Sequence, residues 1–383
     1  GDGAIQAYNY RLCLTDDTTN CVAIPKPEHY DRNEYLSLID DVLSGRNTDV
    51  RFSRVSAEQM EQNRKRILEG GRTAIPGDVW GMSKVTNMVT LPNKKRDANN
   101  QHLALISTDL PEENQPWPTA SWEWRDGFAQ RLKEYTLGLL WFAQHDEELP
   151  ESFRKACLKY GLAADEYTDN GNFPRQVYVR EGRRLEGTYF FTAQDALPSQ
   201  KNGRPPIHSE SITSSHYALD SHAVHKREKN RVHLNGFFSY PTAPYTVPYG
   251  VMVPKETDNL LFPVAVSGSH VGFSTLRMEP CWMALGEAAG YSAAYCVKNN
   301  CSVRDVSVSS IQKDIIDNGG TLIYFKDLTP EDKDFRQVQI LALKGYFPGW
   351  YASLDKEIDE NTAKLWTELS GRPIKCDGGT KRQ

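Results

Sequence analysis

The chain has 383 residues, of which 39% are hydrophobic and 25% are charged, and its formal net charge is −5. A chain of this length exceeds one typical domain, so we expect two or three units with cores of their own. The acidic balance argues against nucleic-acid binding, and no apolar run reaches the roughly 18 residues that a membrane span needs. This composition is typical of a soluble globular protein, and a secreted or periplasmic location stays open.

The first third of the chain predicts one strand, two helices and a long irregular stretch. Residues 1–14 alternate apolar and polar side chains, which predicts a strand. Residues 33–44 and 57–69 have the apolar spacing of amphipathic helices. Residues 75–120 are rich in Pro, Asn, Gly and Trp, so we expect long loops there.

Helices and strands are mixed in the middle of the chain. Apolar residues at helical spacing predict a helix over 121–145, and Pro150 and Gly161 bound a second helix. Residues 175–192 begin with a strand-like pattern. Residues 244–266 are rich in strand-forming residues and are interrupted by prolines. The sequence therefore predicts a mixed α/β (α+β) fold.

The last eighty residues change character. Three amphipathic segments separated by glycine and proline turns predict helices over 308–318, 333–344 and 360–370. Their apolar faces need a partner surface, so we expect residues 303–383 to form a helical C-terminal extension packed on the core.

The most informative stretch is residues 259–296. A predicted strand over 260–266 runs into the small-residue turn Ser267-Gly268-Ser269, and helical segments follow. Backbone N–H groups at such a helix start can meet an anion or the electron-rich edge of a ring. The order of elements therefore favours a ligand-binding turn.

The helix in this stretch carries small residues on one side. Gly286, Ala289 or Gly290, and Ala293 recur at three to four residues, so something must approach the helix backbone closely. Tight packing of the helix on a sheet is the alternative interpretation.

Together with this stretch, five further blocks resemble, in the expected order, one family of FAD-dependent oxidoreductases with a glutathione-reductase-like Rossmann fold. Some members of that family carry a xanthan lyase label. The five blocks are GDGAIQAYNYRLCLTDD at 1–17, DANNQHLALISTDL at 97–110, TDNGNFPRQVYVREGRRLEGTYFFTAQD at 168–195, SSHYALDSHAVHK at 214–226 and PYTVPYGVMVPKETDNLL at 244–261.

The resemblance implies FAD as the cofactor, but the sequence lacks the motif with which a family member holds FAD. A family member should begin with a Gly-x-Gly-x-x-Gly turn that cradles the FAD pyrophosphate, and no such spacing occurs in the 383 residues. We therefore expect the chain to be only the C-terminal part of a flavoprotein with a partial FAD/NAD(P)-binding-type fold. Its partners would be the N-terminal dinucleotide-binding half and a small-molecule substrate, and FAD would be absent from this chain.

The resemblance also suggests how the chain is divided. It assigns residues 1–20 and 170–302 to the flavoprotein core, with the substrate sheet and the second FAD element. Residues 21–169 would form a mainly helical, loop-rich cap over the substrate, and residues 303–383 the helical extension.

A histidine-rich segment supplies the candidate catalytic residues. His216, Asp220 and His222 are implied by the resemblance to lie beside the flavin, where a proton acceptor makes chemical sense. With His225 they also have the spacing H-x5-H-x2-H, but no Cys or Glu completes a known site, so we expect no metal. Hydrogen bonding to the loop backbone is the alternative role.

Cofactor and substrate contacts follow from the same resemblance. The cofactor-binding residues that it implies are Ser267, Gly268, Ser269, His270, Arg277, Met278, Glu279 and Gly286. The substrate-binding candidates are Asn100, Asp109 and Arg180, and a structural ion pair is the alternative role for Arg180.

The leading hypothesis is thus a FAD-dependent oxidoreductase acting on an unidentified small molecule, with a carbohydrate-related compound as one option. This chain alone would be inactive. The alternatives are a polysaccharide (xanthan-type) lyase and an inert fragment that needs its dinucleotide-binding half. The seven cysteines form no C-x-x-C, and whether Cys13 and Cys21 pair stays open.

Overall fold

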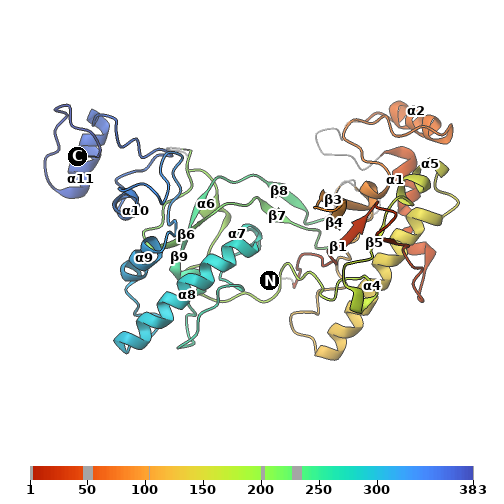
Figure 1. The fold of residues 1–383 in the computed structure, drawn as a ribbon, viewed down its shortest axis with the longest axis horizontal. Helices are drawn as coiled ribbons and strands as arrows, with labels where there is room; N and C mark the ends of the chain where they lie inside the picture. Colours follow the sequence, from red (N-terminus) through yellow and green to blue (C-terminus); the bar gives the residue numbers. More distant parts are fainter. Residues whose placement is uncertain (1–2, 46–54, 103, 200–202, 227–234, 383) are drawn as a thin grey trace. The chain divides into compact units, whose positions relative to one another are not determined.

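Figure 1 shows the fold of the protein in a computed structural model. The structure describes residues 3–45, 55–102, 104–199, 203–226 and 235–382.

The chain divides into two compact units, and neither is continuous in sequence. Unit 1 contains Gly1–Gly182 and His222–Phe237, whereas unit 2 contains Arg183–Ser221 and Phe238–Gln383. Residues 1–20 therefore share a unit with 21–169, and residues 303–383 belong to unit 2.

Unit 1 combines an antiparallel sheet with helices. Its strands are β1 (Leu12–Thr15), β2 (Cys21–Val22), β3 (Thr86–Thr90), β4 (Lys95–Asn100) and β5 (Gly161–Ala163). Its helical segments are η1 (Arg32–Tyr35), α1 (Ser37–Ser44), α2 (Ala57–Leu68), α3 (Met82–Val85), α4 (Trp122–His145), α5 (Glu151–Cys157) and η3 (Thr168–Asn170).

The sheet of unit 1 has the strand order β2-β5-β1-β4-β3, and every neighbouring pair is antiparallel. The central strand β1 is buried along its whole length. Helix α4 begins where Ser121 caps the N–H of Trp124, and its apolar stripe shares one core with β1 (Figure 1). Leu12, Leu132 and Leu139 are at most 1% exposed in this core.

Unit 2 contains two small sheets and several helices. Its strands are β6 (Ser211–Ser215), β7 (Leu219–Ser221), β8 (Phe238–Tyr240) and β9 (Tyr245–Pro248), paired antiparallel as β6–β9 and β7–β8. Its helical segments are α6 (Ala193–Ala196), η4 (Tyr249–Met252), α7 (His270–Leu276), α8 (Glu279–Asn299), α9 (Val308–Asp317), α10 (Phe335–Leu343) and α11 (Glu360–Ser370).

The C-terminal helices help to build the core of unit 2. Ile311, Leu322 and Phe335 are buried in the same cluster as Val247 of β9 and Leu285 of α8. The predicted helices over 308–318, 333–344 and 360–370 are thereby confirmed as α9, α10 and α11. Helices α9 and α10 supply residues of the core itself, and α11 packs against this core through Trp366.

Two predictions of local structure are wrong. The expected strand over 260–266 is irregular, because the chain there bonds outward at single positions: Leu185 N–H donates to the Ala265 carbonyl, and Phe262 N–H to that of Met252. The long loop expected over 75–120 contains α3, β3 and β4. Strand β4 (KRDANN) consists mostly of polar residues, so it lacks the alternation of apolar and polar residues that indicates a strand.

Strand β5 lies between β1, which carries Cys13, and β2, which carries Cys21. Two strand spacings amount to about 9.5 Å, which exceeds the reach of a disulfide. Both thiols are free. None of the helices in the described ranges has the length and apolar character that crossing a bilayer requires.

Candidate functional site

Three charged or titratable side chains meet inside unit 1. Nδ1 of His222 lies 2.7 Å from Oδ2 of Asp109, and Nη1 of Arg180 lies 3.1 Å from Oδ1 of the same carboxylate. His222, Asp109 and Arg180 are at most 6% exposed. The structure therefore brings together one predicted catalytic residue and two predicted substrate-binding residues.

The N-terminal segment holds this cluster in place. The Ala7 N–H donates to the Ala223 carbonyl at 2.8 Å, and the His222 N–H donates to Oε1 of Gln6 at 3.2 Å. Arg180 donates to the Ala7 carbonyl at 2.6 Å and to the side-chain oxygen of Asn9 at 2.9 Å. Three distant segments of the chain are thus joined around the carboxylate of Asp109.

A second layer of polar groups surrounds the cluster. Oδ1 of Asn99, on β4, accepts hydrogen bonds from Asn9 at 2.7 Å and from Arg180 at 2.9 Å. The Tyr8 hydroxyl donates to the Glu181 carbonyl. Burial raises the pKa of Tyr8 well above its usual value, and the charge of Glu181 adds to the effect. Tyr8 therefore stays a neutral donor.

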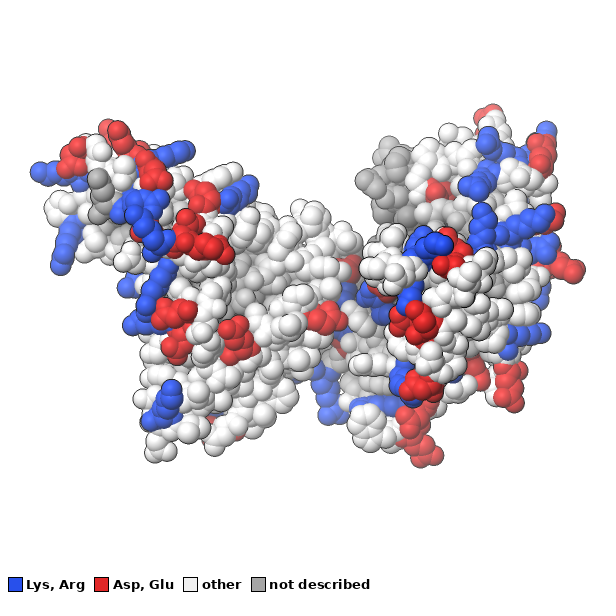
Figure 2. Space-filling view, viewed as in Figure 1, with Lys and Arg blue, Asp and Glu red and all other residues white. Residues whose placement is uncertain are grey.

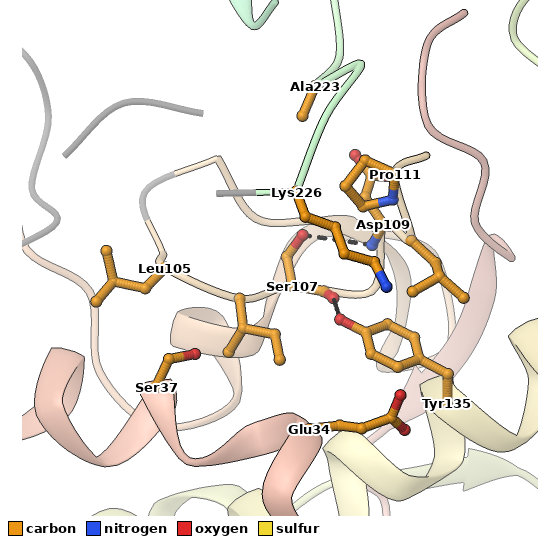
Figure 3. Close-up of a pocket in the computed structure, with 11 residues that line it drawn as sticks. Glu34, Ser37, Leu105, Ser107, Asp109, Pro111, Tyr135, Ala223 and Lys226 are labelled. Atoms are coloured by element: carbon orange, nitrogen blue, oxygen red, sulfur yellow. Dashed lines mark hydrogen bonds between the residues drawn. The ribbon is translucent and has the colours of Figure 1, made fainter. Parts of the chain in front are cut away.

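A cavity of about 370 Å³ adjoins the cluster, because Asp109 forms part of its wall. Figure 3 shows Lys226 and Glu34 pointing toward Tyr135 from opposite sides, with Ser107 between them. The cavity is lined by Glu34, Ser37, Leu105, Ile106, Ser107, Asp109, Leu110, Pro111, Tyr135, Ala223 and Lys226.

The polar groups of the cavity wall are anchored. Tyr135, from α4, donates its hydroxyl to the Ser107 carbonyl at 2.9 Å. The Lys226 ammonium lies 2.6 Å from a carboxylate oxygen of Glu113, and Glu34 pairs with Arg131. Apolar and hydrogen-bonding surfaces therefore alternate around a space large enough for a small organic molecule.

A buried ion triad supports one side of the cavity. Lys84, which is 1% exposed, lies 3.0 Å from Oδ1 of Asp41 and 2.6 Å from Oδ1 of Asp78. Oδ2 of Asp41 accepts the N–H of Leu105 at 2.9 Å. The triad thereby holds the backbone of Leu105, which is one of the residues that line the cavity.

In unit 2, the predicted cofactor turn is bonded within the protein. The Ser267 N–H donates to the Val251 carbonyl at 2.8 Å, and the Ser269 N–H donates to the Phe191 carbonyl at 2.9 Å. The side chain of Ser269 caps the N–H of Gly272 at 2.9 Å. These three N–H groups therefore already have acceptors inside the protein.

The glycines of this turn have a packing role. A Cβ at Gly268 would lie 2.9 Å from the Phe191 carbonyl oxygen, and one at Gly272 would lie 2.4 Å from it. Real Cβ atoms do not approach that closely, so the Phe191 segment itself occupies the space that these two glycines leave open.

Arg277 and His270, two further predicted cofactor contacts, bind residues of β7. Arg277, 3% exposed, donates from Nη2 to the Asp220 carboxylate at 2.6 Å and to the Asp220 carbonyl at 3.0 Å. Nε2 of His270 lies 2.8 Å from Oγ of Ser221. The turn and the D-S-H segment therefore meet inside unit 2 through Asp220 and Ser221, whereas His222 belongs to unit 1.

Helix α8 presents a different picture from the turn. Met278 is its N-cap and Glu279 its first residue. A Cβ at Gly286 would meet nothing within 4 Å, and Met283 and Val297 are 74% and 85% exposed. Figure 2 shows the surface over α8 as mostly uncharged. At Gly286 and Gly290 the described residues do not make the close approach predicted for this helix face, whereas Ala289 packs against the core of unit 2.

The remaining predicted residues have partners of their own or lie buried in a strand. Nε2 of His216 is 3.2 Å from the Thr242 carbonyl in unit 2. His225 pairs with Glu112 in unit 1, and Asn100 ends β4 in a buried position.

One cluster in unit 2 was missed from the sequence. The Asp195 carboxylate accepts hydrogen bonds from Tyr189 at 2.6 Å and from the Thr192 N–H at 2.7 Å, and His208 lies 3.2 Å away. Burial opposes ionisation of Asp195, yet these contacts outweigh it and lower the pKa to about 2. The Thr-x-x-Asp spacing of a capping box was the available signal.

Comparison with known proteins supplies the family. A family model described as FAD dependent oxidoreductase matches residues 1–315. The match begins at residue 1, which is contrary to the expectation that the chain is only the C-terminal part of a family member. It gives no support to the lyase alternative, and neither the curated proteins nor the solved structures contain a match. Because the matched region covers more than half of the chain, the protein belongs to the FAD-dependent oxidoreductase family.

Proposed function

We propose that this oxidoreductase binds a small organic substrate in the cavity of unit 1 and that His222 accepts a proton from it. One observation carries the proposal: Asp109 both lines the cavity and holds Nδ1 of His222 at 2.7 Å. A carboxylate at Nδ1 fixes the orientation of an imidazole and stabilises its protonated form, as it does in other enzymes.

A proton acceptor suits the oxidation that we propose. Oxidation of a C–H next to an O–H or N–H removes a proton as well as a hydride. Family membership implies FAD, which supplies the hydride acceptor. With Nδ1 directed at Asp109, Nε2 of His222 is the atom to which we assign the proton, and Arg180 balances the buried carboxylate charge.

Holding FAD is proposed to need a dinucleotide-binding unit outside these 383 residues. The sequence has no Gly-x-Gly-x-x-Gly, and the N–H groups of Ser267, Ser269 and Gly272 have internal acceptors. The exposed face of α8 around Gly286 and Met283 is the surface that we assign to this unit.

Calorimetric titration of the purified chain with FAD tests the shared cofactor site. We expect no stoichiometric binding, because the pyrophosphate has no cradle here. Adding a dinucleotide-binding unit of the same family should restore flavin retention, and Met283→Glu should weaken that effect. Stoichiometric FAD in the isolated chain would show that these residues hold the cofactor alone.

The proton acceptor is tested by the rate at which substrate bleaches the flavin under anaerobic conditions. In flavin-loaded protein, His222→Gln should slow this step by about 10²–10⁴-fold, the usual contribution of a positioned base. His225→Gln is the matched control, because that ring pairs with Glu112 and is 41% exposed. Equal rates for the wild type and a folded His222→Gln variant would refute the assignment.

A further inference from the structure

The C-terminal end of α8 brings two cysteines together. The helix ends at Asn299, and Asn300 follows in the left-handed conformation with φ 50° and ψ 50°. The N–H of Cys301 then donates to the carbonyl of Cys296 at 3.2 Å. This bond pattern is the Schellman ending of a helix, in which the side chains of the two bonded residues meet.

The two thiols are close neighbours and accessible. Cys301 is near enough to raise the pKa of the Cys296 thiol. Both residues are partly exposed, and neither is in a disulfide. The main-chain bond of 3.2 Å brings the two residues together at the helix end, and a disulfide requires Cα atoms about 4.4–6.8 Å apart.

We propose that Cys296 and Cys301 form a dithiol site that reacts with low-molecular-weight disulfides and closes to an intramolecular disulfide. One protein thiolate attacks a sulfur of the small disulfide, which forms a mixed disulfide and releases the first small thiolate. The second protein thiolate attacks the protein sulfur of that bond and releases the second small thiolate. Two electrons pass to the small disulfide, and the two protein protons end on the released thiols.

The order of attack follows from the surroundings of Cys296. Burial raises the pKa of its thiol, and the neighbouring Cys301 raises it further. Because the thiolate is the nucleophile, we assign the first attack to Cys301 and the resolving step to Cys296.

The crosslink would tie the end of α8 to a second segment of unit 2. Shortly after Cys301, the Val303 carbonyl accepts the Tyr249 hydroxyl at 2.9 Å. Arg304 donates to the Pro254 carbonyl at 3.1 Å. Closing the disulfide would therefore restrain fraying of the last helical turn against a segment that is already held.

Other cysteine pairs provide contrast within the same protein. Strand β5 separates Cys13 from Cys21, and Cys157 and Cys281 are 0% and 4% exposed. The buried thiols Cys13, Cys157 and Cys281 should not react under native conditions, whereas the exposed Cys21 and Cys376 should form mixed disulfides with glutathione and no internal bond.

The test is to incubate the full 383-residue chain with excess oxidised glutathione, unfold it in alkylating reagent and count the remaining thiols. We expect two blocked thiols that carry no glutathione, in addition to the mixed disulfides at the exposed Cys21 and Cys376. Trypsin cleaves after Lys298, so the new bond should link peptides 278–298 and 299–304 with a mass two hydrogens below their sum. Dithiothreitol should reverse the link.

Two variants identify the bonded atoms. Cys296→Ser and Cys301→Ser should each abolish the link and leave at most one glutathione mixed disulfide at the remaining thiol. Circular dichroism checks that both are folded, and each serves as a control for the other. Unreacted thiols at Cys296 and Cys301 in the oxidised wild type, or a link that survives Cys296→Ser through Cys281, would overturn the proposal.

Discussion

Gly272 packs directly against the main chain at Phe191, since a Cβ on this glycine would lie 2.4 Å from the Phe191 carbonyl oxygen. Small residues in this region suggested a ligand-contacting backbone in the sequence. At Gly272 the protein's own chain occupies the space, whereas at Gly286 and Gly290 nothing lies within 4 Å of a Cβ. The same residue type therefore has two different explanations within thirty positions.

Alanine at these glycines should have opposite effects. Gly272→Ala should destabilise the protein by about 1–3 kcal/mol, because the methyl group must displace rigid backbone. Gly290→Ala should be neutral or stabilise by up to about 1 kcal/mol, because alanine favours a helix and the site is open. Urea unfolding measures both. A Gly290→Ala variant as unstable as Gly272→Ala would contradict the packing argument.

The buried pair of Arg180 and Asp109 should contribute far more than an exposed pair of the same type. Arg180→Met leaves the Asp109 carboxylate buried without its cation, which costs roughly 3–5 kcal/mol. Arg175→Met removes the pair with Asp169, whose side chains are 59% and 72% exposed, and should cost about 0–1 kcal/mol. Comparable unfolding free energies for the two variants would count against the buried cluster.

Asp195 should make stability depend on acidity. Its pKa in the folded protein is about 2, below the 3.8 of an ordinary aspartate. A lowered pKa means that the stabilisation is present above about pH 4 and is lost as the pH falls toward 2. Urea midpoints between these values should fall more steeply for the wild type than for Asp195→Asn. Glu256→Gln, at an exposed position, should keep the wild-type slope.

Two leucines on α10 test whether the C-terminal helices belong to the core of unit 2. Leu343 is 7% exposed and Leu341 is 37% exposed. Leu343→Ala should cost about 2–5 kcal/mol through the cavity that it leaves, whereas Leu341→Ala should cost less than about 1 kcal/mol. Thermal unfolding followed by circular dichroism distinguishes them. A detachable helical appendage would show small, equal effects.

Local periodicity predicted the helices better than the strands. Helix α4 and the three C-terminal helices carry apolar residues at helical spacing over two or more turns, so their positions follow from the chain alone. Strands β2 and β5 have two and three residues, which is too short for alternation to be visible. Strand β4 was not predicted, because even its buried positions include polar residues such as Asn100, so no apolar alternation marks it.

The candidate site was harder to foresee because its partners are distant in sequence. Asp220 is the carboxylate nearest to His222 in the sequence, but the side chain that binds this ring is Asp109, 113 positions away. Asp220 instead binds Arg277, 57 positions away. A single sequence carries no signal for such pairings, since both depend on the tertiary structure, which brings distant segments of the chain together.

The interleaving of the two units has a consequence for the order in which the protein can form during synthesis. The last segment of unit 1, His222–Phe237, is translated only after residues 183–221 of unit 2. The bond from Ala7 to the Ala223 carbonyl therefore has to wait until residue 223 has left the ribosome. Neither unit corresponds to a single stretch of coding sequence, so dividing the gene at residue 182 would separate Asp109 from the histidine that it holds.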